Sequence, residues 1–150
     1  MAHLELALSE VLTLADDVPP CPRGLGDWGS TVRDAEEPCL LIDARTTVSA
    51  ISASGCAVLG LGSPAQVIGR PLLAGGLRLL DFTASRCDLT EQEVDKIPPL
   101  LALSSGRLAR GLLRVCRGNG ADRDRTLDAI STPVLRRGEV AGSLTFLAEV

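Results

Sequence analysis

Residues 108–150 contain three strand-like segments joined by glycine-containing turns. The last segment alternates between apolar and more polar residues, which is the period of a strand with one buried face. Its apolar positions are Val140, Gly142, Leu144, Phe146 and Ala148. An Asn-Gly pair at 119–120, the strongest short hairpin signal, separates the first two segments, and Gly138 closes the turn before the third. The pattern predicts consecutive antiparallel hairpins, which disfavours both a helical bundle and a parallel sheet.

Further segments with the pattern of strands or short helices precede this unit. The predicted strands lie at 39–42 and 46–51, and the predicted helices at 56–59, 64–68, 90–97 and 99–105. Thr90 and Glu93 form a capping-box pair, which marks a helix start. The Gly75-Gly76 pair and residues 79–82 give no assignable pattern. This order predicts an α+β fold, with a five-stranded antiparallel sheet and short helices on one of its faces.

The N-terminal segment is predicted to be a separate amphipathic helix. One stripe at helical spacing consists of Leu4, Leu8, Val11, Leu12 and Ala15. Pro19 and Pro20 end this helix, and a segment rich in proline, glycine and acidic residues follows. We therefore divide the chain into a helix at 1–18, a linker at 19–37 and a domain at 38–150. The stripe is expected to form a dimerisation surface, or to pack on the chain's own sheet.

Composition excludes several classes of function. The 150 residues suit one globular domain, with 45% hydrophobic residues and a net charge of −4. The arginines are dispersed, Lys96 is the only lysine, and aromatic residues make up 2%, so nucleic-acid binding is disfavoured. No apolar run approaches the roughly 18 residues of a membrane span. The first residues lack the basic region of a signal peptide, so we expect a cytoplasmic protein.

The residues needed for common catalytic sites are missing or isolated. His3 is the only histidine, so Ser-His-Asp and Cys-His mechanisms lack a base. The paired carboxylates lie in polar connectors, where nothing separates their pKa values. Five cysteines without a Cys-x-x-Cys pattern predict free thiols, mostly in the core. Cys87, beside Arg86, is the candidate for a redox-sensing thiol. We predict no catalysis and no metal site.

Several blocks, taken in order, resemble the PAS sensory domains. These blocks are 40–52, 56–60, 64–72, 130–134 and 138–142. The first is similar to the opening strand pair of that family, the next two to its short helices, and the last two to its closing hairpin. Ser52 stands where the family commonly has Asn. The resemblance covers about residues 38–150 and implies a regulatory module whose sheet and longest helix enclose a small cavity.

The resemblance also guides the choice of ligand and of site residues. Haem held by histidine is disfavoured because His3 lies outside the resemblance. A photoactive flavin is disfavoured because residues 86–89, Arg-Cys-Asp-Leu, lack the Asn and the aromatic residue of the flavin-binding branch. The cofactor is therefore unknown, and we expect an aliphatic cavity with a few polar groups. The candidate cavity residues are Ser52, Cys56, Leu100, Ser104, Asp128, Ser131 and Thr145.

Three functional hypotheses follow from the sequence. The first is a non-enzymatic sensor that forms homodimers, binds a small molecule in its cavity and acts through a signalling partner. The second is an interaction or dimerisation module with a filled core and no ligand. The third is a thiol-based redox sensor that uses Cys87. The first two differ in whether the interior leaves space for a ligand.

Overall fold

The computed structural model of the chain describes residues 25–74, 76–117 and 123–150. Its centre is a six-stranded sheet in the order β2-β1-β6-β5-β4-β3. Every pair of neighbouring strands is antiparallel. The strands are β1 (Cys39–Asp43), β2 (Val48–Ile51), β3 (Leu79–Leu80), β4 (Ala109–Val115), β5 (Arg125–Arg136) and β6 (Glu139–Glu149). The antiparallel hairpins predicted from the alternation are confirmed.

The hairpin of β5 and β6 forms the middle of the sheet. Its pairing runs from Leu127 opposite Glu149 to Arg136 opposite Glu139. Arg137 and Gly138 connect the strands with positive φ angles of 53° and 80°. A two-residue turn of this handedness matches the twist of the flanking strands, which explains why a glycine stands there.

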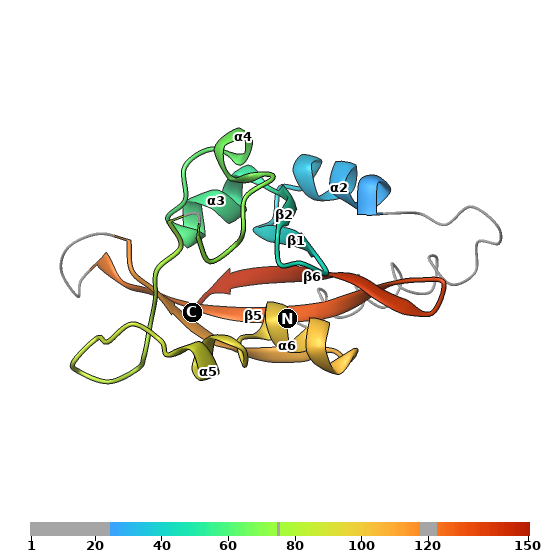
Figure 1. The fold of residues 1–150 in the computed structure, drawn as a ribbon. Helices are drawn as coiled ribbons and strands as arrows, with labels where there is room; N and C mark the ends of the chain where they lie inside the picture. Colours follow the sequence, from blue (N-terminus) through green and yellow to red (C-terminus); the bar gives the residue numbers. More distant parts are fainter. Residues whose placement is uncertain (1–24, 75, 118–122) are drawn as a thin grey trace.

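Five helices accompany the sheet in the described part of the chain. They are α2 (Leu25–Asp34), α3 (Ala53–Leu59), α4 (Pro64–Val67), α5 (Glu91–Val94) and α6 (Pro98–Ser105). Local signals set their ends. Helix α5 begins with the predicted capping box, and α3 and α6 both end at a left-handed glycine. In the view of Figure 1, α3 and α4 lie above the long central hairpin, and α5 and α6 lie below it.

The main core lies between helices α3 to α6 and one face of the sheet, which we call the inner face. Leu113 of β4, Leu127 of β5 and Leu147 of β6 point into this core, where they meet Leu59 of α3 and Leu100 of α6. All five residues are buried. The placement of the short helices on one face is therefore as the sequence predicts.

Helix α2 covers the opposite, outer face of the sheet over β1 and β2. Its Trp28 and Val32 are buried in a second cluster with Cys39, Leu41 and Ala50. Residues 25–34, which the sequence analysis placed in a linker at 19–37, thus form a helix that packs on the sheet. Helix propensity there is weak, because the helix contains Gly26 and Gly29 and the three β-branched or hydroxyl residues at 30–32. Burial of one face of the helix against the sheet compensates for that weakness.

The sheet has six strands rather than the predicted five. The additional strand, β3, consists of Leu79 and Leu80, which pair with Val115 and Arg114 of β4. Two residues are too short for a period of two to be visible in the sequence. The predicted N-terminal stripe lies outside the described residues, and the domain boundaries remain predictions. Within the described ranges, no helix combines the length and hydropathy needed to cross a membrane.

Candidate functional site

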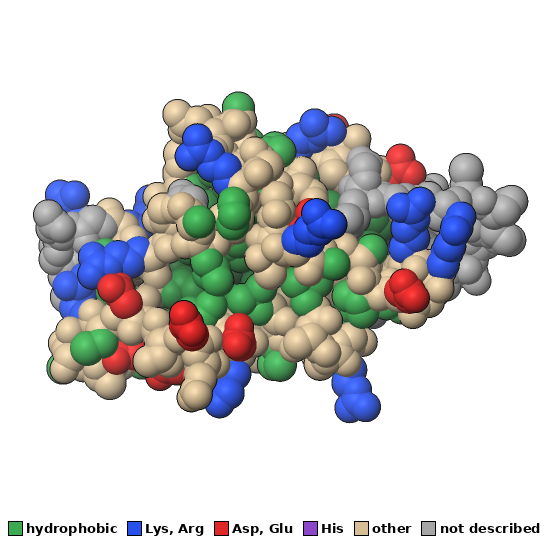
Figure 2. Space-filling model, in the orientation of Figure 1, with side chains coloured by type: hydrophobic (Ala, Val, Ile, Leu, Met, Phe, Trp, Pro, Cys, Tyr) green, Lys and Arg blue, Asp and Glu red, His purple; other side chains and the backbone are tan. Residues whose placement is uncertain are grey.

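The main core is incompletely covered between its two groups of helices. Seven apolar residues that pack against this core are only partly buried, namely Val58, Leu61, Ile68, Leu77, Leu89, Val94 and Leu103. Figure 2 shows hydrophobic side chains gathered across the middle of this face, between an upper and a lower lobe. The face is therefore an apolar groove, with charged side chains along its margins.

A pocket of about 300 Å³ lies in this region, and we call it the leucine pocket. Its walls are Leu73, Leu77, Leu79, Leu89 and Val94, with Arg78 and Asp88 at the rim. The rim residues form an ion pair with 2.9 Å between Arg78 Nε and Asp88 Oδ1. Both side chains are more than half exposed, so the pair contributes little to stability. The pocket thus joins an aliphatic interior to a polar entrance.

Residues 81–88 form a bent segment beside this pocket, and two arginines hold it in place. Arg114 donates from Nη1 to the carbonyl oxygens of Asp81 and Thr83, at 3.1 and 2.9 Å. Arg86 donates to both oxygens of Asp124, at 2.7 and 2.8 Å. Arg86 adopts a positive φ of 52°, a conformation that a non-glycine residue rarely takes without compensation. The paired guanidinium supplies that compensation.

The Asp81 carboxylate organises the same segment internally. Its Oδ1 accepts from the backbone N–H and the hydroxyl of Thr83, at 3.1 and 2.7 Å, and from the N–H of Cys87 at 3.3 Å. These hydrogen bonds, led by that from the Thr83 hydroxyl, lower the pKa of the Asp81 carboxyl group. The carboxylate therefore stays ionised, and its charge fixes the bend.

Four of the predicted cavity residues point into the interior of the domain. Cys56 and Leu100 belong to the main core. The hydroxyls of Ser131 and Thr145 lie on the inner face, 2.6 Å apart, and hydrogen-bond to each other. Because each hydroxyl satisfies the other, this pair leaves no obvious orphan group that demands a ligand.

The other three predicted cavity residues have structural partners elsewhere. Ser52 is buried as the N-cap of α3, and its Oγ accepts from the N–H groups of Cys39 and Gly55. Ser104 is exposed and donates to the carbonyl of Leu101. Asp128 lies on the outer face of β5, where Arg110 binds it at 2.8 Å. Because side chains alternate along β5, Asp128 lies on the opposite face from Leu127, which points into the main core.

None of these seven predicted residues lines the leucine pocket. The residues that do line it come from 73–94. This stretch includes the Gly75-Gly76 pair and residues 79–82, which gave no assignable pattern, and Val94 of the helix predicted at 90–97. The only sequence signal for them is a group of leucines in a segment without a regular period. Leucines in such a segment must be buried by tertiary contacts, and they therefore indicate either a core or a groove.

The pocket walls also limit which cofactors could be held. The chain's only histidine and only asparagine, His3 and Asn119, are not among the wall residues, and neither is glutamine. Flavins and haem are held by such donors or ligands, and the walls of the leucine pocket do not match either group. Cys87 is exposed on the bend at 81–88 rather than in the pocket. Within the described residues, no group of His, Cys, Asp and Glu is arranged for a metal ion.

Comparison with known proteins identifies the fold. No protein-family model matches the sequence, and no curated protein matches it. Among solved structures, the chain is similar to a PAS domain from Colwellia psychrerythraea, with 14% identity over 84% of this chain and 96% of that chain, at a TM-score of 0.57. The chain has a PAS-like fold. The strand order and the position of the short helices account for this similarity.

Two further structures show the same PAS-like fold. One is the LOV domain of the blue-light photoreceptor Aureochrome1, with 17% identity over 81% of this chain and 87% of that chain, at a TM-score of 0.55. The other is the sensor region of a sensor histidine kinase, with 19% identity over 77% of this chain and 40% of that chain, at a TM-score of 0.53. At these identities, the shared property is the fold.

Proposed function

We propose that this PAS-like domain is a non-enzymatic sensor module that binds a small, largely aliphatic molecule in the leucine pocket. The observation that carries the proposal is an opening of about 300 Å³ with five aliphatic walls, directly above the main core. Ligand pockets in proteins range from about 300 to 1,000 Å³. The opening therefore suits a small ligand rather than a large cofactor.

The composition of the pocket indicates the chemistry of the ligand. An apolar ligand body is favoured because each Å² of apolar surface that is buried contributes about 25 cal/mol to the binding free energy. A polar end group can remain at the rim, beside the ion pair of Arg78 and Asp88. A ligand of about ten heavy atoms at ~0.6 kcal/mol per atom would bind with a Kd of tens of micromolar.

Occupancy would be transmitted by the segments that form the walls. Leu79 belongs to β3, which pairs with β4, whereas Leu89 follows the bend that Arg86 ties to Asp124. A ligand that packs best against one arrangement of these segments would shift the population towards it. A signalling partner would then recognise the altered conformation. Homodimerisation through the stripe from Leu4 to Ala15 remains a prediction from the sequence.

The proposal can be tested with octanol, octanoate and octylamine as probes. Titration calorimetry and melting temperature are measured for the wild type, for Leu77→Trp and for Leu135→Trp. Leu77 lines the pocket, whereas Leu135 is an exposed residue near the end of β5. At about ten times Kd, a bound probe should stabilise the domain by ~1.4 kcal/mol, which raises the melting temperature by roughly 4 °C.

We expect at least one probe to stabilise the wild type and Leu135→Trp but not Leu77→Trp, whose larger side chain fills the pocket. The order of affinity among the three head groups reports which rim charge is closer to the ligand. No binding by any probe, or equal binding by Leu77→Trp, would reject the proposal. The hypothesis of a ligand-free interaction module would then be favoured.

A further inference from the structure

Strand β4 has one edge that is mostly open. All seven residues of β4 pair with β5. On the other edge, β3 pairs only with Arg114 and Val115. The segment from Ala109 to Leu113 therefore has no neighbouring strand on this side within the described residues. Proteins usually block such an edge with charges, proline or a bulge. Here its centre is the uncharged sequence Gly111-Leu112-Leu113.

The backbone groups of Leu112 face this open edge. The N–H of Cys116 donates to the carbonyl of Arg78 in the line of β3, at 2.9 Å. Because backbone groups alternate in direction along a strand, the N–H and C=O of Leu112 point to the same side as those of Cys116. No hydrogen bond joins these two Leu112 groups to the described part of the chain. They can accordingly pair with an added strand.

A second pocket, of about 270 Å³, lies against the same edge, and we call it the edge pocket. Its apolar walls come from β3, α6, β4 and the segments between β3 and α6, and are Leu80, Phe82, Leu89, Ile97, Pro98, Gly111, Leu112 and Leu113. Phe82 and Leu112 are 58% and 53% exposed, which are large fractions for such side chains. A strand laid along β4 would place alternate side chains on the inner side, where one of them can enter this pocket.

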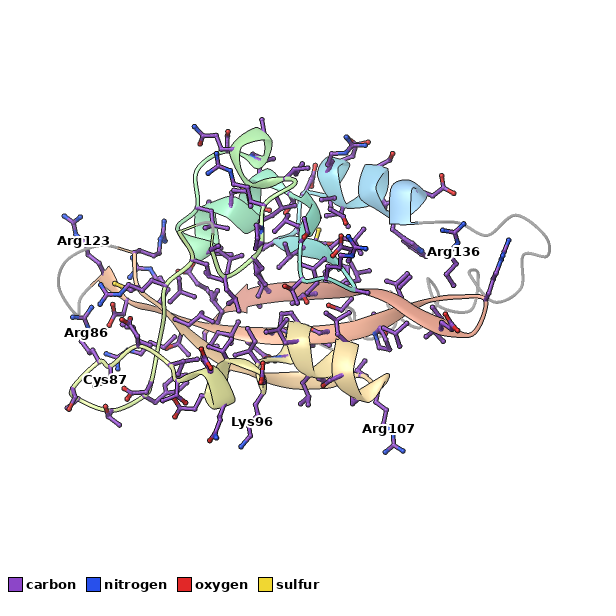
Figure 3. All side chains as sticks on the ribbon, viewed as in Figure 1. Arg86, Cys87, Lys96, Arg107, Arg123 and Arg136 are labelled. Atoms are coloured by element: carbon purple, nitrogen blue, oxygen red, sulfur yellow. The ribbon has the colours of Figure 1, made fainter. Side chains whose placement is uncertain are left out.

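The charges around the edge pocket are mixed, and two of the cations lack an ion pair. The carboxylates of Asp81 and Glu93 accept hydrogen bonds within the bend at 81–88 and within the capping box of α5, and they keep their negative charge. Arg114 pairs with Asp124. By contrast, Lys96 in the pocket wall has no ion pair among the described residues. Arg107, two residues before β4, is likewise unpaired within them, and both side chains project from the same side of the molecule (Figure 3).

We propose that the open edge of β4 binds an extended peptide segment of a partner protein, which adds to the sheet as a strand. The segment carries one apolar side chain for the edge pocket and acidic residues that face Lys96 and Arg107. Backbone pairing supplies affinity, while the pocket and the two cations supply selectivity. This interaction is separate from ligand binding in the leucine pocket, although Leu89 lines both pockets.

Two synthetic eight-residue peptides test the proposal. One is Asp-Glu-Val-Thr-Leu-Thr-Glu-Asp, and the other has lysine at all four acidic positions. Fluorescence polarisation is measured with the wild type, Leu112→Pro and Leu112→Ala. Proline at 112 removes the outward N–H without removing a bond to β5, and edge strands tolerate it there. Circular dichroism checks that each variant is folded.

We expect the acidic peptide to bind the wild type at least tenfold more tightly than the basic peptide. Leu112→Pro should weaken binding at least tenfold, whereas Leu112→Ala, which keeps the N–H, should weaken it by less. Lys96→Glu should reverse the preference for charge, and Arg136→Glu, on the distant hairpin, should not. The amide of Leu112 should exchange rapidly in the free protein and slowly in the complex.

Three results would overturn the proposal. The first is no binding of the acidic peptide at 1 mM to a protein that is folded and monomeric. The second is equal binding by the wild type and Leu112→Pro, which would place the peptide elsewhere. The third is a concentration-dependent dimer that Leu112→Pro abolishes, because the occupant of the edge would then be a second copy of this chain.

Discussion

The Asp124 carboxylate lies between two arginine side chains. Arg86 approaches it to 2.7 Å and Arg114 to 3.0 Å, and only 6% of the Asp124 side chain is exposed. The hydrogen bond from Arg86 is the main reason that the pKa of the Asp124 carboxyl group is lowered. This contact joins the bend at 81–88 to the start of β5, and therefore to the wall of the leucine pocket.

Replacement of this carboxylate tests its contribution. Asp124→Asn removes the charge that both arginines share and leaves the positive φ of Arg86 without compensation. We expect a lower melting temperature and faster amide exchange in 81–88. Asp88→Asn is the matched control, because its ion pair with Arg78 is exposed and should contribute little. Equal effects of the two changes would contradict this role of Asp124.

The same carboxylates predict how stability changes with pH. In the folded state, the pKa values of the Asp124 and Asp81 carboxyl groups lie below the ordinary value for aspartate, mainly because Arg86 and the Thr83 hydroxyl, respectively, donate hydrogen bonds to them. Such groups add stability at pH values above their unfolded pKa, and this contribution is lost as the pH falls through the folded pKa. We expect the urea midpoint to decline from about pH 4 downwards. The decline should be shallower in Asp124→Asn than in the wild type.

Ser131 and Thr145 form a buried pair whose members depend on each other. Ser131→Ala leaves the Thr145 hydroxyl without its 2.6 Å partner, and an unsatisfied buried group costs about 1–3 kcal/mol. Thr145→Val added to that change removes the second hydroxyl and should recover much of the loss. Urea denaturation of the four proteins in this cycle measures the coupling. If the free energy of unfolding of the double variant fell by the sum of the two single losses, the hydroxyls would act independently.

At the scale of the element, two helical glycines differ in the space available for a side chain. A Cβ on Gly55 of α3 would lie 2.9 Å from the carbonyl oxygen of Cys39, which is backbone and cannot move freely. A Cβ on Gly29 of α2 would meet only the Cβ of Ala50, at 3.8 Å. The close approach of α3 to β1 therefore requires a glycine at position 55. The packing of α2 on β2 leaves room for a larger residue at position 29.

Alanine substitutions at these positions should change stability in opposite directions. Gly29→Ala should raise the free energy of unfolding by about 0.5–1 kcal/mol, since alanine loses less backbone entropy in a helix. Gly55→Ala should lower it, because α3 must shift away from β1. Chemical denaturation provides both values. A loss of stability in Gly29→Ala would show that α2 does not pack on the outer face as described.

At the scale of the whole molecule, the reactivity of the cysteine thiols distinguishes global unfolding from exposure in the native state. Cys39 and Cys56 are 1% and 2% exposed, and burial raises the pKa of both thiols. Cys87 is exposed on the bend. A buried thiol with a raised pKa reacts only after the fold opens, because the thiolate is the nucleophile.

Thiol labelling with an aromatic disulfide should therefore proceed in separate stages. We expect Cys87 to be modified in the native protein, and Cys39 and Cys56 to be modified at the rate of global unfolding. Peptide mass spectrometry assigns each stage to its residue. As a control, the change Cys87→Ser should remove a fast stage of labelling. Rapid modification of Cys39 in the native protein would contradict its burial beneath α2.

The local patterns of the sequence determine most of the fold. The period of two in 139–149, the glycine turn at 137–138 and the capping box at Thr90 act over a few residues, so they can be recognised without a structure. They predict the closing hairpin and the start of α5. They do not predict β3 or α2, which are stabilised by contacts with residues far along the chain.

The candidate site depends on contacts that no local pattern contains. The leucine pocket combines Leu73, Leu79 and Leu89, which come from an irregular stretch and meet only after β3 pairs with β4. The register of β4 against β5 decides that Asp128 faces Arg110 on the outer face. Sequence alone determined the class of fold, because hydrophobic period and turn chemistry are local. Tertiary structure decided the pocket, because its walls are brought together by the pairing of distant strands.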